Sequence, residues 1–590
     1  MPSHARDVRF LSRLTLLLPL ALGACAKAPE PAASRSPGGA ILLAAAQSAV
    51  RSDASPTHGS PYGSYLAGLY AGNARDLGAA ADFMLHALSY DPENPQLLSR
   101  TLLLLAGDGR NEEAADIARR LQETNPGNGL AGLILAVEAV RAGELSAADE
   151  LIAGLPERGL SEITGSLVRA WLRVIEGDGA GALEHMAPLR NKNGFEVLYG
   201  LHVALMHDVL GETEAARAQY DSVLEAAGPP SLRLAWLAGN FFERMGEGAR
   251  AIELYEAFLG SNQTSSMITA ALARARDGGA ATPVIGEGAH GIAEALFNLA
   301  SLLSQERSQD VGLVHVHLAL RLRPDFTVAQ VLLGEILQAQ ERSAKAVAVY
   351  RGIPAQSPFA FMARLRIAEE LERLDKVDDA VRELENLAAA EPVRAEALIR
   401  LGNLLRNKER FEEAVSAYDR AVERIGAPEQ RYWTLYYFRG IALERLSNWE
   451  RAERDFLQAL ELEPEQPFVM NYLAYSWVEQ KLHLDKAKGM LVRAVELRPD
   501  DGFIVDSLGW AYYRLGEYDL GVKHLERAVE LRPQDPVIND HLGDAYWRVG
   551  RLHEARFQWR RALSLEPEPE DVQRIESKLK RGLPDQPKDI

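Results

Sequence analysis

The stretch "DHLGDAYWRVGRLHEARFQWRRALSLEP", from Asp540 to Pro567, repeats a pattern that the chain has already used once. Thirty-four residues upstream, Asp506 to Pro533 reads "DSLGWAYYRLGEYDLGVKHLERAVELRP". The recurring positions are Leu508 and Leu542, Gly509 and Gly543, Tyr512 and Tyr546, Gly516 and Gly550, Ala528 and Ala562, and Pro533 and Pro567. A repeated set of small and aromatic residues, rather than reactive ones, indicates a repeated packing unit.

The same unit extends upstream through the second half of the chain. A Gly or Ala stands at positions 300, 334, 368, 402, 440, 474, 509 and 543, and a second small residue follows twelve or thirteen positions later. Pro ends most units, at positions 324, 358, 392, 464, 499, 533 and 567. This pattern predicts two antiparallel helices that cross at small residues, because Pro lacks an N–H and stops the second helix. Aromatic residues, Tyr350, Tyr418, Phe456 and Trp559 among them, are expected to fill the space between the layers.

The unit resembles the tetratricopeptide repeat (TPR). The resemblance covers residues 61–567 and implies an all-α solenoid of about 12–13 helix-turn-helix repeats, because one helical pair cannot bury its apolar face but a stack can. We expect two arrays, 61–276 and 292–567, separated by a glycine-rich joint at 277–291, with the register weakest in 155–195. Residues 568–590 are expected to form a polar capping helix and a tail.

The N-terminus has the features of a secretory signal. Three Arg residues precede the short apolar run "LTLLLPLALGA", which ends at Ala24, directly before Cys25, the only cysteine in the chain. Residues 1–24 therefore resemble the signal peptide of bacterial lipoproteins, and the resemblance implies that Cys25 carries the lipid. Ala26, rather than Asp, follows, which in that family implies transport to the outer membrane. We expect residues 25–60, rich in Pro, Ala, Ser and Gly, to be a flexible linker.

Composition and motifs argue against several functions. With 65 basic and 83 acidic residues the net charge is −18, so nucleic acid is not an expected partner. The G-x-G-x-x-G at 286–291 lacks the strand and acidic residue of a dinucleotide site. His315 and His317, two apart on a helix, point to different faces and are expected to lie on the surface or in a groove rather than share a metal. We expect no catalytic residue, no metal and no cofactor, hence no enzyme.

A binding surface is the function that remains. In TPR arrays the first helix of each repeat lines the concave groove, so the resemblance places these residues there: Asn471, Tyr475, Asp506, Trp510, Tyr513, Arg514, Asp540, Asp544, Trp547 and Arg548. Packing between repeats is the alternative role for the rings of this set. It is not expected to require the five charged residues.

The expected function is a non-enzymatic scaffold at the outer membrane, facing the periplasm and attached through its lipid alone. It would bind envelope proteins or peptides for secretion or pilus assembly, polysaccharide export or control of cell-wall enzymes. The alternative is a periplasmic glycan-binding module. A peptide ligand would depend on Arg514 and Arg548, and a sugar on the rings of Trp510 and Trp547.

Overall fold

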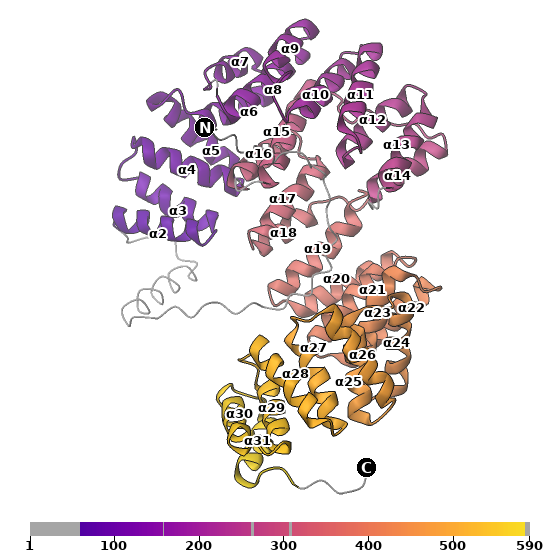
Figure 1. The fold of residues 1–590 in the computed structure, drawn as a ribbon. Coiled ribbons are helices and arrows are strands. Elements are labelled where there is room, and N and C mark those ends of the chain that lie inside the picture. Colours follow the sequence, from indigo (N-terminus) through magenta and orange to yellow (C-terminus); the bar gives the residue numbers. More distant parts are fainter. Residues whose placement is uncertain (1–59, 157, 261–264, 306–308, 585–590) are drawn as a thin grey trace, which may run out of the picture. The chain divides into compact units, whose positions relative to one another are not determined.

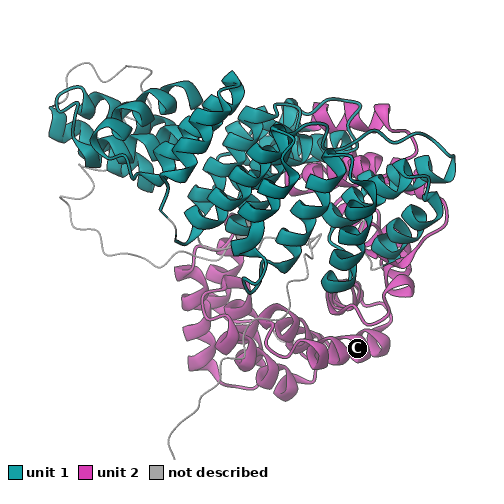
Figure 2. Ribbon diagram, turned by 90° about the horizontal axis from the view of Figure 1, so that it is seen from above, with its two compact units in different colours: residues 1–380 teal, residues 381–590 magenta. Residues whose placement is uncertain are grey.

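The computed structural model describes residues 60–156, 158–260, 265–305 and 309–584. Across these ranges the chain forms thirty α-helices and two 3-10 helices, with no strand. Figure 1 shows these helices coloured along the chain. The fold is therefore an all-α solenoid of helical repeats, as the sequence predicted. The chain divides into two compact units, residues 1–380 (unit 1) and 381–590 (unit 2), coloured separately in Figure 2. The predicted signal peptide and linker, including Cys25, lie outside the described residues.

Unit 1 holds the helices α2 (Pro61–Asn73), α3 (Leu77–Leu88), α4 (Pro95–Asp108), α5 (Asn111–Thr124), α6 (Gly129–Ala142), α7 (Leu145–Ala153), α8 (Leu160–Ile175), α9 (Gly179–Met186), η1 (Ala187–Leu189), α10 (Glu196–Val209), α11 (Thr213–Ala227), α12 (Leu232–Arg244), α13 (Gly248–Gly260), α14 (Ser266–Arg276), α15 (Gly288–Gln305), α16 (Gln309–Leu322), α17 (Thr327–Ala339), α18 (Ser343–Arg351) and α19 (Ala360–Arg373). Helix α20 (Val377–Ala390) spans the division between the units.

Unit 2 holds α21 (Glu396–Asn407), α22 (Phe411–Ile425), η2 (Gln430–Tyr432), α23 (Trp433–Arg445), α24 (Trp449–Leu462), α25 (Pro467–Gln480), α26 (Leu484–Leu497), α27 (Gly502–Arg514), α28 (Tyr518–Leu531), α29 (Pro536–Arg548), α30 (Leu552–Ser564) and α31 (Pro569–Arg581). Consecutive helices pack as pairs, from α2 with α3 through α12 with α13, and from α21 with α22 through α29 with α30. None of the described helices combines the length and the apolar character needed to cross a membrane.

A glycine in the first helix and an aromatic ring in the second make the crossing of a pair possible. A Cβ atom on Gly402 would stand 2.3 Å from the Tyr418 ring, and one on Gly334 would stand 2.4 Å from the Tyr350 ring. These two rings are at most 1% exposed. The predicted roles of the small residues and of the rings are confirmed at these crossings, because only the missing side chain leaves room for the ring.

A left-handed residue in the turn between paired helices fixes the register where the sequence did not. Gly143, Gly177 and Gly211 all have positive φ, and they lie 34 residues apart. Gly177 therefore marks the turn from α8 to α9 inside the ambiguous stretch 155–195. Other repeats place Glu341 or Asp375 in the same conformation, which explains why glycine alone did not reveal the period.

The glycine-rich segment 277–291 lies inside unit 1, and the division between the compact units falls later, between Ala380 and Val381. The segment leads into α15, which packs on α8 and α10, while α16 packs on α4 and α6. A Cβ on Gly291 would lie 2.1 Å from the Trp171 ring, so this motif glycine lets α15 approach α8. The boundary differs from the expected one because the helices after the segment share the core of the helices before it.

The histidines on α16 belong to that core. His315 is 3% exposed, and its Nδ1 lies 2.8 Å from the Val311 carbonyl oxygen. Burial lowers the pKa of His317 to about 4, with the positive charges of Arg342 and Lys345 acting in the same direction. The expectation of a surface position was wrong for His315, because α16 is covered by the N-terminal repeats.

Candidate protein-binding face

First helices of neighbouring pairs lie side by side, as α8 with α10, α25 with α27 and α27 with α29. Together the first helices form what we call the first-helix face. In unit 1 this face is covered by the chain itself, since α15 and α16 lie against α4, α6, α8 and α10. Arg233 of α12 donates from Nε to Glu294 of α15 at 2.8 Å, and both residues are buried. Arg321 of α16 donates from Nε to Glu138 of α6 at 2.9 Å. A partner could not occupy the covered part of unit 1 without displacing these helices.

The segment that follows α14 also packs on the first helices of unit 1, through a contact with α12. Asn240 of α12 donates from Nδ2 to the backbone carbonyl of Thr282 at 2.9 Å. His202 of α10 is fully buried between the indole N–H of Trp171, 3.1 Å from its Nδ1, and Asn298, 3.3 Å from its Nε2. Burial lowers the pKa of His202 to about 4, which keeps the ring neutral at physiological pH. These buried polar contacts fix the helices in place.

In unit 2 the first-helix face is made by α21, α23, α25, α27 and α29, and it carries all ten predicted groove residues. Asp506 of α27 and His541 of α29 are both buried, and the carboxylate lies 3.0 Å from the His541 Nδ1. Trp510 stacks on His541 at 4.0 Å between ring centroids and on Tyr513 at 4.6 Å, and its Nε1 donates to Glu479 at 2.7 Å. Trp510 is only 9% exposed, so little of its ring is available to a ligand.

The next two carboxylates of the predicted set are neutralised from α31. Lys578 donates from Nζ to Asp540 at 2.8 Å and to Asp544 at 2.7 Å, and Arg574 lies 3.0 Å from Asp540. Asp544 also accepts from the Trp559 indole at 2.8 Å. The expectation that packing does not require Asp540 and Asp544 is wrong, because both are buried and joined to the capping helix.

The predicted arginines also have partners within the chain. Arg514 donates from Nη1 to the Glu479 carboxylate at 2.8 Å, and Arg548 donates from Nη1 to the Pro584 carbonyl oxygen at 2.9 Å. The Nε of Arg548 is buried, and its N–H has no hydrogen-bond acceptor among the described residues. Trp547 lies against Trp559, with 5.4 Å between ring centroids. Arg514 therefore joins two neighbouring repeats, Arg548 joins the last repeat to the segment after α31, and Trp547 packs within its own repeat.

Asn471 and Tyr475 of α25 complete the predicted set. The Oδ1 of Asn471 is buried and has no donor among the described residues. Burial raises the pKa of Tyr475 above its ordinary value, and the charges of Glu479 and Asp506 raise it further. Tyr475 packs against the apolar cluster that contains Trp510.

Three exposed apolar residues on these first helices, Phe468, Phe503 and Val537, were not predicted from the sequence, and we call them the apolar strip. Each is the second residue of its helix, and the three are 39%, 48% and 42% exposed. Their helices α25, α27 and α29 are neighbours. The strip lies one turn before the predicted residues, because each member is three positions from Asn471, Asp506 or Asp540. An apolar residue at one register in three successive repeats was the signal that could have revealed it.

A pH dependence of stability follows from the buried histidine. Burial of the His541 ring would lower its pKa, but the charge and hydrogen bond of Asp506, helped by the charges of Asp540 and Asp544, raise it above 6.5. A raised folded-state pKa contributes stability that is fully present below the unfolded pKa and is lost as the pH rises through the folded pKa. We expect wild type to exceed His541→Asn in free energy of unfolding most clearly below about pH 6.

Urea denaturation of both proteins from acid to alkaline pH measures this difference. His524→Asn is the matched control, because burial lowers the pKa of His524, so its stabilising contribution grows with pH. A wild-type advantage over His541→Asn that stays constant or increases with pH would contradict the assignment.

The helix pairs, with glycine and aromatic residues at their crossings, define an α-solenoid repeat protein. A family profile described as "Tetratricopeptide repeat" matches residues 207–266 and 365–429, and one described as "TPR repeat" matches 509–550. The chain thus contains tetratricopeptide repeats. Such repeats form protein-interaction scaffolds. Within the described ranges no group of three His, Cys, Asp or Glu side chains could hold a metal ion.

Individual relatives are distant. The general transcriptional corepressor ssn6 of Schizosaccharomyces pombe is 25% identical over 134 residues, which is 23% of this chain and only 12% of that protein. The Cut9–Hcn1 hetero-tetramer of the APC/C is 15% identical, with a TM-score of 0.36, over 92% of this chain and 99% of that one. YrrB, titled a TPR protein with an unusual peptide-binding site, is 21% identical, with a TM-score of 0.27, over 33% and 97%. TM-scores this low carry no argument about function.

Proposed function

We propose that the chain is a non-enzymatic adaptor whose unit 2 binds an extended segment of a protein partner along the first-helix face. The observation that carries this is the apolar strip of Phe468, Phe503 and Val537. Three large apolar side chains, each between 39% and 48% exposed and one per repeat, are left uncovered on neighbouring helices. Exposed apolar patches rimmed by polar groups are typical of protein interaction sites.

The surroundings of the strip suit a peptide. The Arg532 guanidinium lies 4.1 Å from the Phe503 ring centroid, and the Arg498 guanidinium lies 5.4 Å from that of Phe468. Arginine beside aromatic rings is a frequent composition of binding hot spots.

A double substitution on the strip tests the site. We expect Phe468→Ala with Phe503→Ala to reduce recovery of the principal crosslinked partner from envelope extracts about tenfold or more, since truncating hot-spot side chains commonly costs 2 kcal/mol or more. Melting temperature and helical signal should stay near those of wild type, because both side chains are already partly exposed.

Phe557→Ala is the matched control, since Phe557 is 62% exposed on α30, a second helix outside the strip. Recovery by this variant should equal wild type. If the double variant captures the partner as wild type does, the strip is not the binding site.

A sugar ligand receives less support than a peptide. The glycan alternative depends on open faces of Trp510 and Trp547. Trp510 is stacked on two other rings and is 9% exposed, and the Arg556 guanidinium lies 5.2 Å from the centroid of the Trp547 ring.

The cellular setting is part of the same proposal. The apolar run before Leu22-Gly23-Ala24-Cys25 and the single cysteine support a lipid anchor, and Ala26 supports the outer membrane as its destination. The adaptor would face the periplasm and serve an envelope system such as secretion or pilus assembly, polysaccharide export or control of cell-wall enzymes.

Cys25→Ser should abolish lipidation and release the protein from the membrane. Two or three acyl chains give stable anchoring, each buried CH₂ contributing about 0.8 kcal/mol, and no other cysteine can replace the lost sulfur. Labelled fatty acid incorporation and membrane fractionation measure the result. A variant that still takes up the label and still sediments with the outer membrane would disprove the anchor.

A further inference from the structure

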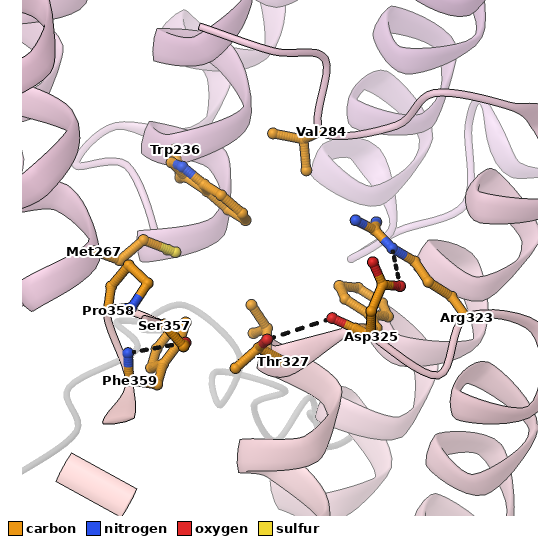
Figure 3. Close-up of a pocket in the computed structure, with 11 residues that line it drawn as sticks. Trp236, Met267, Val284, Arg323, Asp325, Thr327, Ser357, Pro358 and Phe359 are labelled. Atoms are coloured by element: carbon orange, nitrogen blue, oxygen red, sulfur yellow. Dashed lines mark hydrogen bonds and ion pairs between the residues drawn. The ribbon is translucent and has the colours of Figure 1, made fainter. Parts of the chain in front are cut away.

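A cavity of about 150 Å³ lies in unit 1. Its walls come from Trp236 of α12, Met267 of α14, Val284 of the glycine-rich segment, the turn between α16 and α17, and the loop before α19 (Figure 3). Three rings line it, those of Trp236, Phe326 and Phe359. A dry apolar cavity of about this volume is large enough to hold a benzene ring.

Hydrogen bonds hold the segments that form these walls. Ser266 Oγ donates to the Pro358 carbonyl, which joins the start of α14 to the loop before α19. In that loop the Phe359 N–H donates to Ser357 Oγ at 3.2 Å. The side chain of Asn240 holds the glycine-rich segment two residues before Val284. The cavity is therefore preformed, which lowers the entropic cost of filling it.

Arg323 gives the cavity a charged wall. Its Nε and Nη1 are buried and form no hydrogen bond within the described residues. Among the described residues its ion-pair partner is Asp325, 3.4 Å from Nε, and the Asp325 side chain is 79% exposed. An ion pair with so exposed a carboxylate is weak, because water competes for it.

A second arginine, Arg233, lies close to Arg323 and also has a nitrogen without a hydrogen-bond acceptor in the described residues. Arg233 and Arg323 both lie over the Phe326 ring, at 5.2 and 4.9 Å from its centroid. Arg233 is held by Glu294, but its Nη1 has no acceptor in the part of the chain that the structure describes. The region therefore has more N–H donors than carboxylate oxygens to receive them.

We propose that this cavity is a second binding site, independent of the first-helix face of unit 2, for an acidic peptide in which a phenylalanine lies next to a glutamate or aspartate. The phenyl ring would enter the cavity against Trp236, Phe359 and the Met267 thioether, which favours contact with rings. The neighbouring carboxylate would lie beside the Arg323 guanidinium, whose charge is paired among the described residues with the exposed carboxylate of Asp325. Within the chain, Arg323 already contacts such an acidic residue and aromatic residue in sequence, Asp325 and Phe326.

The test uses the full chain with its methionine methyl groups ¹³C-labelled, and the capped peptide Ac-Gly-Gly-Phe-Glu-Gly-Gly-NH₂ as probe. The Met267 methyl resonance, assigned with Met267→Leu, should shift on titration and give a dissociation constant of about 0.1–1 mM, typical of one anchored side chain. Arg323→Gln should weaken binding about tenfold, as loss of a charge-assisted contact does. Val284→Trp, which fills the cavity, should abolish the shift.

Control measurements separate the site from nonspecific attraction. Arg276→Gln removes an arginine of α14 that is 57% exposed and pairs with Glu256, and it should bind as wild type does. Peptides with Ala in place of Phe, or Gln in place of Glu, should each bind at least about tenfold more weakly. The proposal is overturned if the probe leaves Met267 unshifted, if the Ala peptide binds equally well, or if Arg323→Gln binds as tightly as Arg276→Gln. Unchanged helical signals in all variants exclude misfolding as the cause.

Discussion

Gly543→Leu is expected to lower the free energy of unfolding by about 3 kcal/mol or more, since it combines overpacking with partial loss of a buried tryptophan. A Cβ at Gly543 would stand 2.5 Å from Cδ1 and Nε1 of Trp559 and 3.2 Å from the Ala555 carbonyl oxygen. Trp559 is fully buried and donates its indole N–H to Asp544. A side chain at 543 must therefore displace the ring and break that hydrogen bond. Chemical denaturation measures the loss.

Gly489→Leu is the matched control, because Gly489 is a helical glycine of the same unit with nothing within 4 Å of an added Cβ. It should be neutral or stabilising by up to about 1 kcal/mol, the difference in helix propensity. Because each repeat contacts only its neighbours, hydrogen exchange in Gly543→Leu should increase first in α27 to α31. Equal stability of the two variants would show that the crossing lies elsewhere.

Lys578→Met is expected to destabilise the protein by about 3–5 kcal/mol, the usual cost of leaving a buried charge without its partner. The ammonium group donates to both oxygens of Asp540 and to Asp544, and the Lys578, Asp540 and Asp544 side chains are 8%, 1% and 5% exposed. Arg574, 45% exposed, pairs with Asp540 and Asp571 but not with Asp544, so it cannot replace the lysine there.

Two comparisons isolate the charge effect. Lys580→Met removes a lysine of the same helix that is 75% exposed, and it should change stability by less than about 0.5 kcal/mol. Adding Asp540→Asn and Asp544→Asn to Lys578→Met should recover much of the loss, because the uncompensated carboxylates are then gone. If Lys578→Met and Lys580→Met are equally stable, α31 is not needed to neutralise these carboxylates.

Two groups of residues show which contacts could be predicted from the sequence and which could not. The crossings at Gly402 and Gly543 were predictable, since each pairs with a ring sixteen positions later and the spacing recurs along the chain. The partners of the groove residues were not predictable in the same way. Asp540 and Lys578 occur in a repeat and in a capping helix that share no pattern, so nothing in the sequence indicates that they meet.

The sequence by itself determined the all-α repeat fold, the phase of most helices and the face on which a partner is proposed to bind. It could do so because neighbouring repeats contact each other at a constant separation, which the period of small and aromatic residues records. Only the tertiary structure decided that α15 and α16 cover the N-terminal repeats and that the Arg323 cavity exists. Those contacts join positions as distant as Glu138 and Arg321, and a separation that occurs once leaves no period to detect.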